Sequence, residues 1–205
     1  MGQSSTRWDA STYECDWRQV LSLLNSGAFI LDIVADINLP KDASILEIGI
    51  GSGKWSTAYS IMGYKVTAMD NNPEMLEQAK TNFPNIKIEY VLDDLLNLSS
   101  EASKRKYELV FNEGVLEHVL DKDERIAAIK AMRDCCIDDG YVYFLVPFLS
   151  EEEDEHRYTS IKEMHDEIMA AKLKPCTVDI IAIQTGTPEN RRIRQMLRVV
   201  GKRRG

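Results

Sequence analysis

The sequence predicts an α/β fold with a doubly wound, mostly parallel sheet and helices on both faces. Three observations predict it. From about residue 43 onward, short apolar runs alternate with helical patterns, Gly and Pro residues mark the ends of those patterns, and polar residues follow the apolar runs. Strands that alternate with helices pair in parallel through right-handed crossovers, and ligands bind beyond the carboxyl ends of the strands.

The elements are expected in the following order. Apolar residues at mixed three- and four-residue spacings between Trp17 and Ile37 indicate helix, with a break near Gly27 and an end before Pro40. Five apolar runs then predict strands at Ser44–Ile48, Lys65–Met69, Ile86–Val91, Glu108–Asn112 and Tyr141–Val146. Helical patterns lie between them at Lys54–Met62, Pro73–Asn82 and Lys122–Ile137.

The last third of the chain begins with an acidic run after Pro147 that is typical of a solvated loop. Ser160 and Glu163 form a capping box that opens a helix ending at about Lys172. A strand at Thr177–Ile183 follows, and Pro188 is expected to open a basic C-terminal helix.

Charge and composition narrow the class of protein. The net charge is −8, yet residues 191–204 carry seven basic side chains, so the rest of the chain is more acidic than the total suggests. An acidic surface argues against general nucleic-acid binding. The four Cys residues, of which Cys135 and Cys136 are adjacent, suggest neither a disulfide framework nor a metal site, which favours a reduced, cytoplasmic location. The start MGQSST fits a loose myristoylation template, but one acyl chain gives only marginal membrane binding, so no stable anchor is expected.

The stretch SILEIGIGSGKW, at residues 44–55, combines an acid with three alternating glycines. A triphosphate-binding loop does not fit, because Ile48 occupies its first glycine position and Trp55 replaces its Ser or Thr. The dinucleotide spacing also fails, because its third glycine would fall at Lys54 or Ser56.

The strands that follow carry further polar residues at their ends. The second strand ends in Ala68-Met69-Asp70 and the third in Asp93-Asp94-Leu95. The fourth ends in Asn112 and is followed by Val115-Leu116-Glu117-His118-Val119, and the run from Gly140 to Pro147 forms the fifth. In order and spacing, residues Ala43 to Pro147 resemble a class I S-adenosylmethionine-dependent methyltransferase, of the branch that mostly methylates small molecules. The resemblance implies a seven-stranded Rossmann-like sheet.

The resemblance also implies roles for individual residues. Gly49, Gly51 and Gly53 would let the backbone approach the cofactor closely, Glu47 would accept hydrogen bonds from its ammonium group, and Asp70 would accept both ribose hydroxyls. Asp94 and the Leu95 amide would read the adenine edge, with Asp93 as the alternative if the register differs by one. Asn112 would contact the methionyl group.

The function implied is methyl transfer by in-line displacement from S-adenosyl-L-methionine, with S-adenosyl-L-homocysteine as product, to a small-molecule acceptor. His118 is the candidate base, and His156, Tyr158, Tyr13 and Trp17 are weaker candidates for the acceptor site. No metal constellation is predicted. The chain is expected to be a single domain, with an N-terminal helical lid segment (1–40), a core (43–184) and a basic C-terminal tail (186–205).

Two alternatives stay open. One is an RNA or protein methyltransferase that uses Arg191–Arg204 to hold a nucleic acid or an acidic partner. The other is a non-catalytic protein that binds the cofactor. The oligomeric state and the acceptor do not follow from the sequence.

Overall fold

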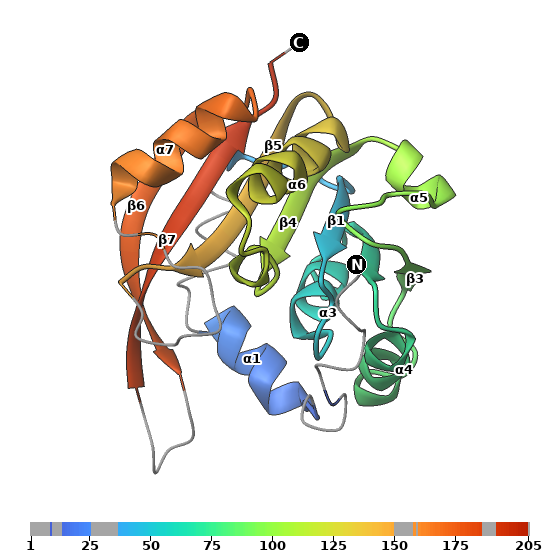
Figure 1. Ribbon diagram of the computed structural model, residues 1–205. Coiled ribbons are helices and arrows are strands. Elements are labelled where there is room, and N and C mark those ends of the chain that lie inside the picture. The colour runs from blue at the N-terminus through green and yellow to red at the C-terminus, as the bar shows by residue number, and fades with distance from the viewer. Residues whose placement is uncertain are drawn as a thin grey trace. The chain divides into compact units, whose positions relative to one another are not determined.

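The structure is a computed structural model that describes residues 9, 14–25, 37–149, 158, 160–185 and 192–204 (Figure 1). The chain divides into two compact units, Met1–Leu109 and Val110–Gly205. The described strands form one seven-stranded sheet in the order β3-β2-β1-β4-β5-β7-β6. This order confirms the predicted α/β class and the seven-stranded Rossmann-like sheet.

The first unit contains the parallel strands β1 (Ser44–Ile48), β2 (Lys65–Asp70) and β3 (Ile88–Leu92). Its helices are α1 (Trp17–Asn25), α3 (Lys54–Ile61), α4 (Pro73–Asn82) and the short α5 (Glu101–Lys104), which was not predicted. Both α3 and α4 pack against β2, and α1 packs against α3. The start of α4 follows from local chemistry, because Asn72 accepts a hydrogen bond from the Glu74 amide and Pro73 takes the first helical position.

Strand β4 (Tyr107–Glu113) begins in the first unit and ends in the second. The second unit continues with the 3₁₀ helix η2 (Leu116–His118), α6 (Lys122–Asp134), β5 (Cys136–Pro147), α7 (Ile161–Ala170), β6 (Lys174–Thr185) and β7 (Arg192–Lys202). Helix α6 packs against β5 and α7, and α7 packs against β6. The predicted capping box is confirmed, because the Ser160 hydroxyl accepts the Glu163 amide at 3.1 Å.

The C-terminal segment corrects one prediction. Arg192–Lys202 is not a helix but strand β7, which pairs antiparallel with both β5 and β6. In sequence, Ile193, Met196, Leu197 and Val200 have helical spacing. A strand with neighbours on both edges and side chains buried on both faces does not need the strict alternation that marks a half-exposed strand, so its pattern resembled a helix.

Candidate functional site

A glycine-rich turn follows β1 in the first unit. Gly49, Gly51 and Gly53 all have positive φ, at 80°, 51° and 80°. The amides of Gly49 and Ile50 donate to the carbonyl of Met69, at 2.8 and 3.2 Å, so the turn lies against the end of β2. Gly53 is constrained twice, since a Cβ added there would meet the Ala79 Cβ at 3.0 Å in addition to the strain of its left-handed φ.

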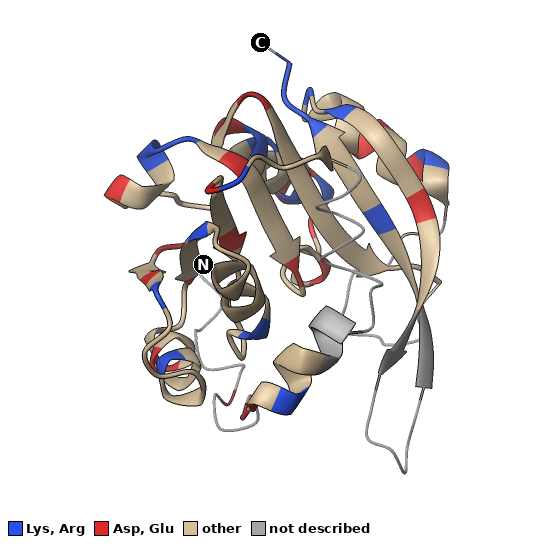
Figure 2. Cartoon of the chain, turned by 180° about the vertical axis from the view of Figure 1, so that it is seen from behind, with Lys and Arg blue, Asp and Glu red and all other residues tan. Residues whose placement is uncertain are grey.

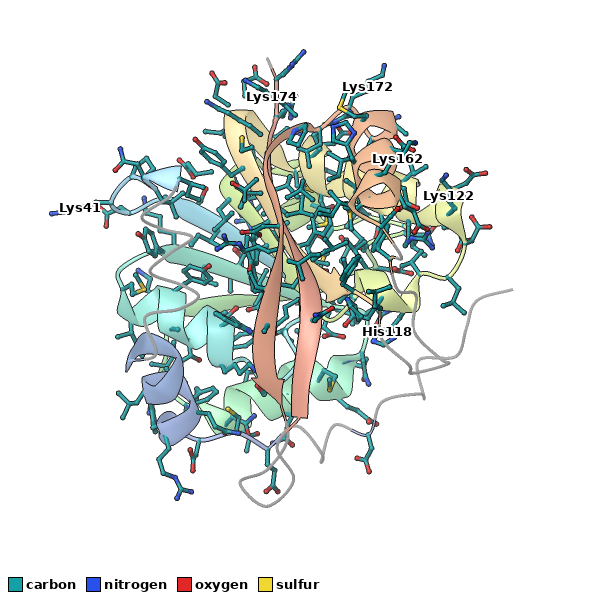
Figure 3. The ribbon with its side chains drawn as sticks, turned by 90° about the vertical axis from the view of Figure 1, so that its left-hand side faces the viewer. Lys41, His118, Lys122, Lys162, Lys172 and Lys174 are labelled. Carbon is teal, nitrogen blue, oxygen red and sulfur yellow. The ribbon has the colours of Figure 1, made fainter. Side chains whose placement is uncertain are left out.

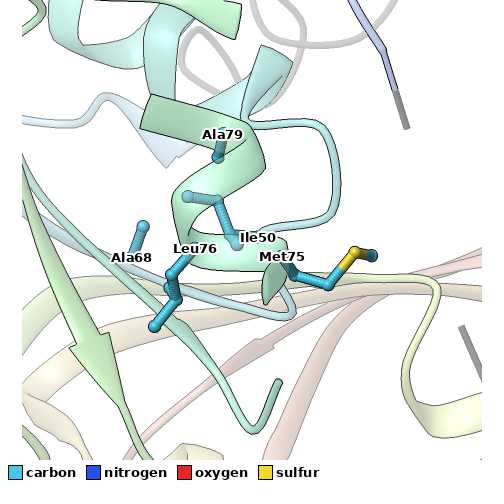
Figure 4. Close-up of a cluster of buried hydrophobic side chains, with 5 residues drawn as sticks. All are labelled: Ile50, Ala68, Met75, Leu76 and Ala79. Atoms are coloured by element: carbon cyan, nitrogen blue, oxygen red, sulfur yellow. The ribbon is translucent and has the colours of Figure 1, made fainter. Parts of the chain in front are cut away.

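Helix α4 holds this turn in place. Ile50 is buried in a cluster with Ala68 of β2 and with Met75, Leu76 and Ala79 of α4 (Figure 4). Asn82, the last residue of α4, donates through its side-chain amide to the Ser52 carbonyl at 3.0 Å. The glycine turn is therefore fixed by apolar packing and by a hydrogen bond that was not predicted from the sequence.

Glu47 lies at the end of β1 and is 2% exposed. A buried carboxylate is costly unless polar groups or charges compensate it. The hydroxyl of Ser56, from the first turns of α3, donates to its Oε2. Ser56 was missed, because only the return of α3 across the strand brings positions 47 and 56 together.

Asp70 ends β2 beside the glycine turn. Its Oδ1 accepts the Asn72 amide at 2.9 Å. Burial raises the pKa of the Asp70 carboxyl above its ordinary value, and hydrogen bonds from the amides of Asn72, Gly51 and Ile50 offset only part of that shift. The acid predicted to hold the ribose is therefore joined to the glycine turn by the main chain.

Asp93 and Asp94, which the sequence left as alternatives, have different surroundings. The Asp93 carboxylate accepts the amides of Asp94, Ser99 and Ser100, each at 3.0 Å. Burial acts to raise the pKa of Asp93, but these bonds outweigh it and lower the pKa to about 2. Asp93 therefore organises its own loop. Asp94 is half-buried, and its Oδ1 accepts the Leu96 amide at 3.0 Å. Leu95 is buried.

The N-terminal segment lies against the same region. Trp17, which is 43% exposed, meets Phe83 edge-on with ring centroids 5.4 Å apart. Burial raises the pKa of the Cys15 thiol, while a hydrogen bond with Ser52 in the glycine turn acts in the opposite direction. Tyr13 and most of the predicted lid segment lie outside the described residues.

Asn112 and His118 belong to the second unit. Asn112 is fully buried near the end of β4, beside Phe111, whose ring stacks on Tyr143 at 5.3 Å. After β4, Gly114 has a φ of 85° and the chain turns into η2, where half-buried His118 donates its amide to the Val115 carbonyl. Asn112 and His118 therefore sit at the end of β4 and just beyond it, where the sequence placed them.

A buried ion pair supports the segment after η2. The Arg125 guanidinium of α6 and the Glu167 carboxylate of α7 meet at 2.7 Å, and both are nearly inaccessible. Arg125 also donates to the carbonyls of Val119 and Leu120, at 2.9 and 2.8 Å. The Tyr158 hydroxyl donates to Glu167 at 2.5 Å.

Tyr158 is therefore a buried structural residue, which argues against its predicted place in the acceptor pocket. Its main chain pairs with the end of β5, donating to the Pro147 carbonyl and accepting the Leu149 amide, each at 3.2 Å. The charged pair is not visible as a sequence motif, because its members are 42 residues apart. His156 lies outside the described residues.

Three basic residues of the C-terminal segment form ion pairs within the second unit, and Arg204 is exposed. Arg198 pairs with Asp179, Lys202 with Asp139 and Arg203 with Asp138. Figure 2 marks Lys and Arg in blue and Asp and Glu in red along the described chain. These three paired cations lie on strand β7 and in the segment just after it.

Within the described residues, no helix is long and apolar enough to cross a membrane. Within the same ranges, no group of three or more His, Cys, Asp or Glu side chains is arranged to hold a metal ion.

The donor set of the first unit fits S-adenosylmethionine better than a phosphate. Two carboxylates, Glu47 and Asp70, flank a turn whose backbone is closely packed and whose glycines carry no side chain. Carboxylates accept hydrogen bonds from ammonium and hydroxyl groups, whereas they repel phosphate.

Comparisons with known proteins agree with this reading. Residues 45–140 match a family model described as a methyltransferase domain. No curated protein sequence matches the chain. A structure of a SAM-dependent methyltransferase from Methanosarcina mazei is 19% identical with a TM-score of 0.69, and the match covers 84% of this chain and 97% of the other.

Two further solved structures are similar over most of the chain. A chain in the complex between the Haloferax volcanii Trm112 methyltransferase activator and a methyltransferase is 16% identical with a TM-score of 0.71, covering 98% of this chain and 100% of the other. Magnesium protoporphyrin IX methyltransferase from Synechocystis, with bound SAM, is 17% identical with a TM-score of 0.63, covering 100% and 86%. At these identities the likeness establishes a shared fold.

Proposed function

The chain belongs to the class I S-adenosylmethionine-dependent methyltransferases, and on this premise we propose that it methylates a small-molecule acceptor. One observation carries the choice of acceptor. Three of the seven basic residues that would have anchored an RNA or an acidic protein, Arg198, Lys202 and Arg203, pair with acids on β7 and at its end. Apart from the sheet and its helices, the N-terminal segment and the segment after β5 remain to form an acceptor site.

We further propose that Glu47, the glycine turn, Asp70, Asp94 with the Leu95 amide, and Asn112 hold the cofactor. The position of Glu47 suits an ammonium group, because Ser56 orients a carboxylate that is otherwise shielded from water. The position of Asp70 suits a ribose diol, because the main chain holds its carboxylate beside the glycine turn. The loop bonds of Asp93 favour Asp94 for the adenine edge.

When bound, S-adenosylmethionine supplies an activated methyl group on a sulfonium. The chain's own contribution is to align the acceptor with that methyl group, and alignment alone can lower a barrier by up to about 7–11 kcal/mol in ideal intramolecular cases. His118 is proposed as the group that removes a proton from the acceptor where the acceptor must lose one. The N-terminal segment, which contacts the glycine turn through Cys15, is proposed to cover the site.

The cofactor assignment is tested by titration calorimetry with S-adenosylmethionine. We expect Asp70→Asn to weaken binding about tenfold or more, because one or two hydrogen bonds to a charged acceptor are lost. Glu101→Gln, which removes an exposed carboxylate from α5, serves as the matched control and should bind like the parent. Equal affinities in all three proteins would reject the proposed role of Asp70.

The same residue predicts a pH dependence. Because the pKa of Asp70 is raised, its carboxylate gains a proton at a higher pH than an ordinary Asp, and cofactor affinity should start to fall above pH 3.8 as the pH is lowered. The Asp70→Asn variant should not show this fall in affinity.

The acceptor class is tested by incubating the parent with methyl-labelled cofactor and cell extract and then separating small molecules, RNA and protein. Label confined to RNA or protein would overturn the small-molecule proposal.

A further inference from the structure

A basic cavity lies in the second unit, where β5 and β6 begin and β7 ends. Its volume is about 480 Å³. Five cationic side chains and one acid line it: Arg133, Lys172, Lys174, Arg203, Arg204 and Asp134. This concentration of positive charge stands out in a chain whose net charge is −8.

Two of the five cations have a structural role. Arg133 donates through Nη1 to the Ala171 carbonyl at 2.6 Å, just past the end of α7. Arg203 donates through Nη1 to the Cys136 carbonyl at 2.6 Å, just past the end of α6. Because helix C-termini carry partial negative charge, these two guanidinium groups stabilise the ends of both helices.

The other three cations have no such role. Lys172, Lys174 and Arg204 are exposed, and none of them forms an ion pair with any residue in the described ranges. Lys172 has a φ of 58°, in the left-handed region, so it occupies a defined turn between α7 and β6. Leaving three like charges around one cavity is unfavourable for the fold on its own, and a bound anion would offset that repulsion.

The surroundings limit the size of that anion. A cavity of about 480 Å³ falls in the range of small-molecule sites. Asp138 and Asp139, which pair with Arg203 and Lys202, are 69% and 77% exposed and border the basic cluster. A long nucleic acid strand would meet these carboxylates, whereas a compact anion would not. The half-exposed Met169 and the buried Leu173 add apolar contact on one wall.

The cavity is separate from the candidate site residues of the second unit. It lies at the start of β5, whereas Asn112 and His118 lie at the carboxyl end of β4 and just beyond it. The 12 residues of β5 span about 40 Å at roughly 3.3 Å per residue. Figure 3 accordingly shows Lys172 and Lys174 at one end of this unit and His118 well away from them.

We propose that this cavity is a second ligand site, which binds a small phosphorylated molecule carrying at least two negative charges. Lys172, Lys174 and Arg204 supply the direct contacts, whereas Arg133 and Arg203, whose charges are paired with Asp134 and Asp138, stabilise the helix ends beside them. The site goes beyond methyl transfer and does not depend on the proposed acceptor.

The test is calorimetry of the full chain with inorganic pyrophosphate as the probe. The parent should bind pyrophosphate more tightly than inorganic phosphate, and binding should weaken as salt rises from about 20 to about 150 mM. In Lys172→Gln/Lys174→Gln, affinity at low salt should fall about thirtyfold, since each charge lost at about 4 Å in water costs roughly fivefold. The matched control is Lys41→Gln/Lys122→Gln, which removes two exposed lysines outside the cavity (Figure 3) and should bind like the parent.

Three results would overturn the proposal: no heat of binding for the parent at about 1 mM pyrophosphate, equal affinity in both double variants, or tight binding of a single-stranded RNA oligonucleotide with none of pyrophosphate. S-adenosylmethionine affinity, measured on the same preparations, should be unchanged in the cavity variant. This readout shows that the variant is folded and separates the test from that of the proposed function. Arg204→Gln provides a second variant, with an expected loss of about fivefold.

Discussion

Replacing Glu167 with Ala should destabilise the second unit by about 3–5 kcal/mol, because it leaves a buried cation without its partner. Arg125 is only 2% exposed, and two of its guanidinium nitrogens donate to Glu167, Nη2 at 2.7 Å and Nε at 3.3 Å. Water cannot take over the lost contacts without opening the packing between α6 and α7. The loss would be a large part of the stability of an ordinary protein, which is about 5–15 kcal/mol.

Two further variants divide this effect into its parts. Tyr158→Phe removes one hydrogen bond to a charged acceptor and should cost about 1.5–3 kcal/mol. Arg125→Met/Glu167→Met removes both charges together, so the penalty of an unpaired ion disappears. The double variant should still lose about 1–2 kcal/mol, because the carbonyls of Val119 and Leu120 lose their donor and the Tyr158 hydroxyl loses its acceptor.

The measurement is equilibrium unfolding in urea, followed by far-UV circular dichroism and by Trp fluorescence, with coincident transitions as the check on two-state behaviour. In thermal unfolding, Glu167→Ala should lower the Tm by about 6–20 °C, given 2–4 °C per kcal/mol for a chain of this size. A loss below about 1 kcal/mol for Glu167→Ala, or a double variant as unstable as Glu167→Ala, would refute the reasoning.

Three other predictions follow from the first unit and from His118. Gly53→Ala should cost more stability and more cofactor affinity than Gly63→Ala, because both glycines have positive φ but only a Cβ added at Gly53 would meet Ala79. Equal losses in urea unfolding and in calorimetry would contradict the close-contact argument. Asp93→Asn should lower the free energy of unfolding by about 2 kcal/mol at neutral pH, because the pKa of Asp93 is about 2 in the folded protein against an ordinary 3.8, so its carboxylate stabilises the fold above pH 3.8. The difference in unfolding free energy between parent and variant should vanish as the pH falls to about 2, and a difference that does not change with pH would show that the carboxylate charge is irrelevant. His118→Asn should lower kcat by about 10²–10⁴ while leaving cofactor affinity unchanged, if it acts as the base; an unchanged kcat and pH–rate profile would remove it from the mechanism.

Much of the fold followed from local patterns. The alternation of apolar runs with helical spacing, the cap at Asn72 and the capping box at Ser160 depend on residues within a few positions of one another, so they can be read from sequence. Strand β7 could not, because its place between β5 and β6 depends on partners far along the chain, and a two-sided buried strand has no period of its own to identify it.

The candidate site, too, was predicted only in part from the sequence. An acid followed by glycines at alternate positions, with Asp70 at the next strand end, identified the cofactor from sequence, because each strand end brings its own polar residue to a common edge. The tertiary structure decided what surrounds those residues: Ser56 against Glu47, Asn82 against Ser52, and Asp93 enclosed by its own loop. It also joined Arg125 to Glu167 and collected five cations around one cavity. These arrangements require segments distant in sequence to meet, and that meeting is set by packing of the whole core, not by any short motif.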